Sequence, residues 1–297
     1  MPVNKNASLL RTLLTEAEFL ARSVSKEKFP VPLRSIAERR RVTSVEFRPL
    51  LVDAMLTTHP NGFRILFNSN GADAVELRNR YQDENPEKLL PSRLRFSLAH
   101  ELAHTFFYDL SKNRPQVVKQ FRAGGKKTAL DNLERNCNRI AGRLLVPTKM
   151  LKVAFNNRKS FCPELVFNLS KRAGVSAETL VRRLDETTSP FLEQSFYGCV
   201  VLVERSHGEM TIAAVAKPKN MNIARELLLL RSGERWQLKS RDGFEIDPAT
   251  ASSVSSVNLT VETSRSTSLR QYQMLTKNIG RFDSVERYLI TFEELRN

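Results

Sequence analysis

Apolar residues recur at helical spacing over residues 92–107, and this pattern predicts a helix that is buried along one face. The repeating positions are Leu94, Leu98, Leu102 and Phe106. Ala99 and Ala103 flank them, and Ser92, which follows Pro91, can cap the start of the helix. We therefore expect a core helix in the middle of the first half of the chain.

A second helical pattern covers residues 133–145 and stops before Pro147, as helices tend to do. Its apolar face consists of Leu133, Cys137, Ile140, Ala141, Leu144 and Leu145. Because each predicted helix has one apolar face, the second helix can pack on the first.

The remaining part of the first half indicates short helices and a small sheet. Helices are predicted over 8–24 and 33–40, and strands over 42–47, 50–57 and 62–68. The last strand is followed by Asn68-Ser-Asn-Gly71, a turn signal. Residues 71–91 are polar and charged and are expected to form an insertion.

Residues 163–184 indicate two apolar helices joined by Ala173-Gly-Val-Ser176, which is typical of a helix-turn-helix. One interpretation is DNA contact through Arg182 and Arg183. The other, which we favour, is a helical hairpin that packs on the preceding domain.

Residues 189–297 alternate between apolar and polar positions in several short stretches, including 197–204 and 210–216. We predict an α+β protein with two domains. Residues 1–188 would form a domain with a small N-terminal sheet and a closing helical hairpin. Residues 189–297 would form a β-rich C-terminal domain, for which we consider a sensory role.

Composition indicates a globular protein without a membrane span. The chain has 297 residues, of which 41% are hydrophobic, and no apolar run approaches the roughly 20 residues that cross a bilayer. The first 20 residues lack a long apolar core and carry acids, unlike a signal peptide. The three cysteines are widely separated, which favours a reducing cytoplasm over a disulfide framework.

The net charge of +15 has two interpretations. It can attract acidic partners, nucleic acid among them, or it can be a solvated basic surface. One segment, 112–129, contains no acid and six basic residues: Lys112, Arg114, Lys119, Arg122, Lys126 and Lys127. This segment is either one rim of a cleft or an ordinary loop.

The strongest chemical signal is His100-Glu101-Leu-Ala-His104. Residues four apart on a helix project from the same face, so the two imidazoles can meet on one metal ion. Glu101 lies about 100° around the helix, where it can reach a water beside the metal. This spacing predicts a Zn²⁺ site with Glu101 as general base.

Zinc in hydrolytic sites usually has three protein ligands. Glu134, on the second predicted helix, is a candidate for the third. From spacing alone, Glu134 could equally be a solvated carboxylate near a helix terminus.

The two helices together resemble the ImmA/IrrE family of metallopeptidases. Residues 95–104 are similar to the family signature RFxxAHELxH, and residues 134–147 are similar to ExxxNxxAxxLLxP. The resemblance covers about residues 30–185 and implies that Glu134 is the third zinc ligand. It also implies a regulatory protease whose protein substrate is a repressor-like DNA-binding protein. The chain departs from the family in having Ala103, where Gly is frequent, and the long segment 71–90.

We therefore predict a zincin-like, zinc-dependent endopeptidase, with zinc held by His100, His104 and Glu134 and with Glu101 as catalytic base. The strand over 62–68 is a candidate edge for holding a peptide substrate. One alternative is a DNA-binding regulator whose zinc site is structural or silent. Another is a scaffold that holds nucleic acid on its basic surface without a metal.

Overall fold

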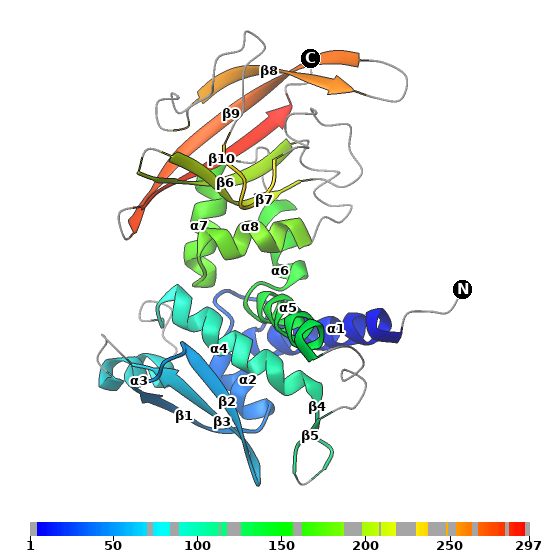
Figure 1. Ribbon diagram of the computed structural model, residues 1–297, viewed down its shortest axis with the longest axis vertical. Helices are drawn as coiled ribbons and strands as arrows, with labels where there is room; N and C mark the ends of the chain where they lie inside the picture. Colours follow the sequence, from blue (N-terminus) through cyan, green and yellow to red (C-terminus); the bar gives the residue numbers. More distant parts are fainter. Residues whose placement is uncertain are drawn as a thin grey trace. The chain divides into compact units, whose positions relative to one another are not determined.

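The computed structural model describes residues 5–69, 74–83, 89–112, 114–117, 126–156, 162–186, 198–207, 209–217, 230–236, 248, 254–262, 267–282 and 285–294. It divides into two compact units (Figure 1). Unit 1 comprises residues 1–151 and 172–175, and unit 2 comprises residues 152–171 and 176–297. The mixed α+β class is confirmed. The division after residue 188 stays a prediction.

Unit 1 contains most of the helices. They are α1 (Lys5–Ser25), α2 (Leu33–Arg39), α3 (Ala74–Asp83), α4 (Ser92–His104), the short 3-10 helix η1 (Thr105–Phe107), and α5 (Lys126–Leu145). The strands are β1 (Val42–Arg48), β2 (Ala54–His59), β3 (Gly62–Asn68), β4 (Tyr108–Asp109) and β5 (Gln116–Val117). Helices α6 (Thr148–Asn156) and α7 (Pro163–Ala173) carry residues of both units.

The first three strands form a sheet in the order β1-β3-β2, with β3 parallel to β1 and antiparallel to β2. Phe63, Ile65 and Phe67 are fully buried on one face of β3, in the alternation expected of a strand. The expectation that the strand over 62–68 offers a free edge is wrong, because β3 is paired on both sides. The edge strands of this sheet are β1 and β2.

This sheet has two local features that the sequence did not predict. Strand β2 begins at Ala54 rather than at residue 50, and Leu51, in the preceding bend, is fully exposed. Gly62 allows a close approach of two backbones, since a Cβ at this position would lie 2.0 Å from the carbonyl oxygen of Arg41.

Helix α4 packs against β2 on one side and against α5 on another (Figure 1). Its Leu98, Ala99, Leu102 and Ala103 are fully buried. The facing helix α5 buries Cys137, Ile140, Ala141, Leu144 and Leu145 completely. Each fully buried large aliphatic side chain contributes about 1.5–3 kcal/mol, so this pair of apolar faces fixes the two helices side by side.

Helix α1 is joined to α5 by a partly buried ion pair between Glu18 and Arg143. Glu18 accepts hydrogen bonds from Nη1 of Arg143 at 2.6 Å and from Oγ1 of Thr148 at 2.9 Å. Burial raises the pKa of Glu18, but these hydrogen bonds and the charge of Arg143 outweigh it and hold the pKa below its ordinary value. The C-terminal half of α5 is thereby fixed to α1.

Unit 2 contains α8 (Ala177–Glu186) and the strands β6 (Gly198–Ser206), β7 (Glu209–Ala216), β8 (Val254–Glu262), β9 (Thr267–Phe282) and β10 (Val285–Glu294). The strands form one antiparallel sheet in the order β7-β6-β10-β9-β8. Val201, Ile290, Phe292 and Trp236 belong to a buried cluster on this sheet. The predicted β-rich C-terminal region is therefore confirmed.

Helix α8 packs against β7 and β6. Arg183 is only 2% exposed, and its guanidinium bonds Glu186 at 3.4 Å. Arg182 donates to Glu178 at 2.9 Å and to the carbonyl oxygen of Ala213 at 3.0 Å. DNA contact through Arg183 is wrong as an interpretation, because this side chain lies in the protein interior.

Three further expectations can be compared with the described residues. Among these residues, no helix has both the length and the apolarity needed to cross a membrane. Cys137, Cys162 and Cys199 are all free thiols, and the first and last of them are buried. In the basic segment, Lys119 and Arg122 lie outside the described residues, whereas Lys126 and Lys127 belong to the first turn of α5.

Candidate metal centre

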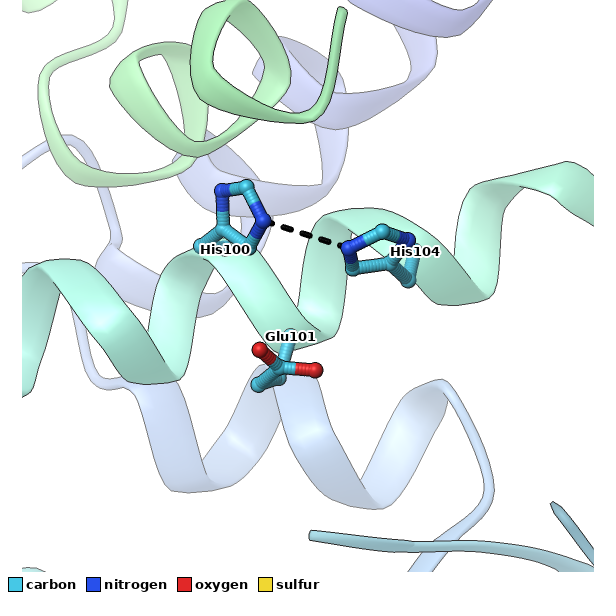
Figure 2. A group of neighbouring side chains, drawn as sticks. All are labelled: His100, Glu101 and His104. Carbon is cyan, nitrogen blue, oxygen red and sulfur yellow. Dashed lines mark hydrogen bonds between the residues drawn. The ribbon is translucent and has the colours of Figure 1, made fainter. Parts of the chain in front are cut away.

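The two histidines of α4 lie one helical turn apart with their rings turned toward each other (Figure 2). Their Nε2 atoms are 3.1 Å apart. One donor atom from each of His100, Glu101 and His104 lies within 4.8 Å of the other two. The predicted spacing thus produces a compact set of potential metal ligands.

Helix α5 adds Glu134 to this set. Its Oε2 atom lies 3.0 Å from Nε2 of His100, and its Oε1 atom lies 3.6 Å from Nε2 of His104. Zinc binds nitrogen at about 2.0–2.1 Å, so two ligand atoms of a tetrahedral ion are about 3.3–3.4 Å apart. The separations observed here bracket that value, and two imidazoles with one carboxylate are a donor set that suits a divalent metal.

The outer nitrogens of both histidines have partners on the same helix. Nδ1 of His100 lies 2.9 Å from Oδ1 of Asn138, and Nδ1 of His104 lies 3.4 Å from Sγ of Cys137. Sequence reasoning assigned no role to either partner. Their spacing could have indicated that they lie near the histidines, because residues three and four positions after Glu134 share its face of the helix.

Glu101 lies in a different environment from Glu134. It is 9% exposed, and the backbone of Leu56, in β2, hydrogen-bonds its carboxylate. Burial raises the pKa of Glu101, while the charge of His100 and the bond from Leu56 act in the opposite direction. A carboxyl with a raised pKa takes up a proton more readily than an ordinary glutamate.

Burial and charge also act on His104 and Cys137. Burial, and then the neighbouring His100, lower the pKa of His104, which favours the neutral imidazole that a metal ligand requires. Burial, and then the charges of Glu134 and Glu101, raise the pKa of Cys137 well above its ordinary range. The thiol is therefore a neutral neighbour of His104.

The C-terminal end of α4 is fixed by Arg40, which follows α2. Its guanidinium donates to Oγ1 of Thr105 at 3.1 Å and to the carbonyl oxygen of Thr105 at 2.7 Å. It also stacks over the ring of Phe106 at 4.2 Å and pairs with Glu16. A cation that binds the last carbonyls of a helix stabilises its end, here directly after His104.

The N-terminal end of α4 is fixed by two further arginines. The guanidinium of Arg95 is buried and donates to the carbonyl oxygen of Val31 at 3.0 Å. Arg93 binds the carboxylate of Asp53 through Nη2 and Nε at 2.9–3.2 Å, in a two-pronged arrangement. Both ends of the helix that carries the histidines are thus held in place.

Comparison with known proteins agrees with the resemblance drawn from the sequence. Residues 85–185 match the family model Peptidase_M78, described as the IrrE N-terminal-like domain. This segment includes His100, Glu101, His104 and Glu134, and the resemblance to the ImmA/IrrE family is confirmed for it. The match implies peptidase activity and a protein substrate.

No curated protein matches the chain. Among solved structures, a Mycobacterium tuberculosis transcriptional regulator is similar at 14% sequence identity, with a TM-score of 0.47. The alignment covers 95% of this chain and 75% of that one.

Proposed function

We propose that the protein is a zinc-dependent endopeptidase. The observation that carries this proposal is the convergence of three donor atoms, from His100, His104 and Glu134, at separations of 3.0–3.6 Å. A structural zinc site normally has four protein ligands, whereas three ligands leave a position for water or substrate. These three residues would hold the ion, and Glu101 would be the catalytic base.

Zinc bound at this position would lower the pKa of water and polarise the scissile carbonyl. Glu101 accepts a proton from the attacking water and donates it to the leaving amine. Burial raises the pKa of Glu101, which favours uptake of the proton from water.

The outer edge of β2 is the best-supported place for the peptide substrate. Asn68 donates to the carbonyl oxygen of Asp53 at 2.9 Å, which places these two residues in a hydrogen-bonded antiparallel pair. Because such pairs alternate along a strand, the main-chain groups of Ala54, Leu56 and Thr58 point away from β3. The proximity of the Leu56 backbone to Glu101 supports this placement, because an extended peptide added at that edge would pass the donor cluster.

We further propose that the substrate is a repressor-like DNA-binding protein in the cytoplasm, and that its cleavage releases transcription. This part rests on the resemblance of residues 95–104 and 134–147 to the ImmA/IrrE signatures. The net charge of +15 is compatible with a substrate that is itself bound to nucleic acid.

The test is the Glu101→Gln variant, which keeps the size of the side chain but removes the proton acceptor. We expect cleavage to fall about 10²-fold or more, with zinc content unchanged. Cleavage is measured on labelled casein and on repressor-like proteins encoded by the same genome. Glu38→Gln, an exposed carboxylate of α2, is the matched control and should cleave normally. Wild-type rates in the Glu101→Gln protein would refute the assignment of Glu101 as the base.

A further inference from the structure

Helix α5 contacts both ring nitrogens, Nε2 and Nδ1, of each of the two histidines of α4. Glu134 lies against the Nε2 atoms, while Cys137 and Asn138 lie against the Nδ1 atoms of His104 and His100. These three side chains occupy positions i, i+3 and i+4 and therefore share one face of the helix.

The partner of Nδ1 decides which nitrogen of a neutral imidazole carries the proton. An amide oxygen can only accept a hydrogen bond, so the 2.9 Å contact with Oδ1 of Asn138 favours a proton on Nδ1 of His100. The Glu134 carboxylate, 3.0 Å from Nε2, is a competing acceptor until a cation occupies the space between them. With a cation bound, the proton on Nδ1 leaves the lone pair of Nε2 free to hold it. A thiol sulfur can accept a hydrogen bond from Nδ1 of His104 in the same way, but more weakly.

We propose that Asn138 and Cys137 are positioning residues that set the tautomer and the ring orientation of His100 and His104 for metal binding. The inference rests on the proposed function in assuming that the donor cluster binds zinc. Helix α5 then supplies one ligand and also orients the other two. Asn138 has the larger role, because an amide oxygen is a stronger acceptor than a thiol sulfur.

The first test measures zinc affinity by competition with a chromophoric chelator. Asn138→Leu removes the acceptor at similar size, and we expect it to weaken zinc binding by about 10–100-fold. Asn138→Asp keeps an acceptor and should remain near the wild type. Asn132→Leu, an exposed asparagine on another side of the same helix, is the control and should leave affinity unchanged. Unchanged affinity in Asn138→Leu would overturn the proposal for this residue.

The second pair tests Cys137. Cys137→Ser retains an acceptor, and Cys137→Val fills the site without one. We expect the valine variant to lose a few-fold in zinc affinity and the serine variant to keep it. Because Cys137 is fully buried, thermal unfolding of the metal-free variants shows whether either change acts through stability instead. Equal affinity in the two variants would exclude an orienting role for the thiol.

A third measurement does not depend on zinc. Nitrogen chemical shifts of the imidazoles report the tautomer directly, and they are recorded on the metal-free Glu134→Ala protein, which lacks the competing carboxylate at Nε2 of His100. We expect the Nδ1–H form for His100 in this protein and a mixture once Asn138→Leu is added. If His100 carries its proton on Nε2 in the Glu134→Ala protein, the inference fails even where zinc binds the wild type. If the tautomers are as expected but Glu101→Gln cleaves at the wild-type rate, the proposed function fails and this inference stands.

Discussion

Helices α4 and α8 both carry side chains for which the sequence suggests a function, and the structure treats them differently. In α4, His100 and His104 meet at 3.1 Å and are joined by Glu134 from α5. In α8, Arg183 is buried and Arg182 bonds Glu178 and a backbone carbonyl. The side chains of α4 and Glu134 converge on a common centre, whereas Arg182 and Arg183 bond groups within unit 2.

The difference lies in what each motif requires. Two histidines four residues apart meet because of the geometry of the helix itself, whatever surrounds it. A DNA-reading helix also needs its basic face to be open to solvent, and that depends on where the rest of the chain packs. Helix α8 packs on β7 and β6, so the requirement fails for Arg183.

The largest expected effect concerns Glu134, the proposed ligand that comes from outside α4. Glu134→Gln removes an anionic donor, and we expect zinc affinity to fall by more than about 10²-fold, beyond the loss typical of a residue that only orients a ligand. Glu178→Gln, in α8, is the comparison and should bind zinc normally. Full-strength zinc binding by the Glu134→Gln protein would remove Glu134 from the ligand set.

A smaller effect separates the two arginines of α8. Arg183→Ala removes a buried side chain and should lower the free energy of unfolding by about 2–3 kcal/mol. Arg182→Ala removes an exposed ion pair and should cost less than about 1 kcal/mol. Denaturant unfolding of both variants checks the values. If Arg182→Ala retained its stability but lost duplex DNA binding seen in the wild type at low salt, the regulatory alternative would gain support.

The smallest effect concerns the attachment of α5 to α1. Glu18→Gln should lower the free energy of unfolding by about 1–2 kcal/mol at pH 7, because a charged hydrogen-bond acceptor is lost. The folded-state pKa of Glu18 is below its unfolded value, so the wild-type advantage is present above the unfolded pKa and is lost as pH falls through the folded one. Unfolding curves from pH 7 down to pH 3 should therefore converge. A constant difference over that range would contradict the pKa shift.

Periodicity was sufficient to predict α4 and the buried part of α5, since Leu98, Leu102, Ile140 and Leu144 all lie in the core. It was misleading at residues 50–53, where a short apolar run suggested a strand. Leu51 is instead fully exposed in a bend. A short apolar run does not reveal which neighbour, if any, covers it.

Strand order and hydrogen-bond partners were beyond the sequence for a different reason. That β3 is the central strand, with β1 and β2 at the edges, depends on pairing between segments, which no local pattern specifies. The contact between Leu56 and Glu101 follows from that order. Asn138 and Cys137 could have been noticed from their spacing to Glu134, but only the packing of α5 on α4 shows which nitrogens they meet.

Glu134 follows His104 by 30 residues, and this separation has a thermodynamic consequence. Zinc shared between α4 and α5 would act as a cross-link that closes the intervening loop. By the chain-entropy relation used for disulfides, a cross-link of this span restricts the denatured chain by about 3–4 kcal/mol. The ion would then stabilise the fold reversibly, as well as take part in the reaction. The supply of zinc would govern both the activity of the protein and its lifetime in the folded state.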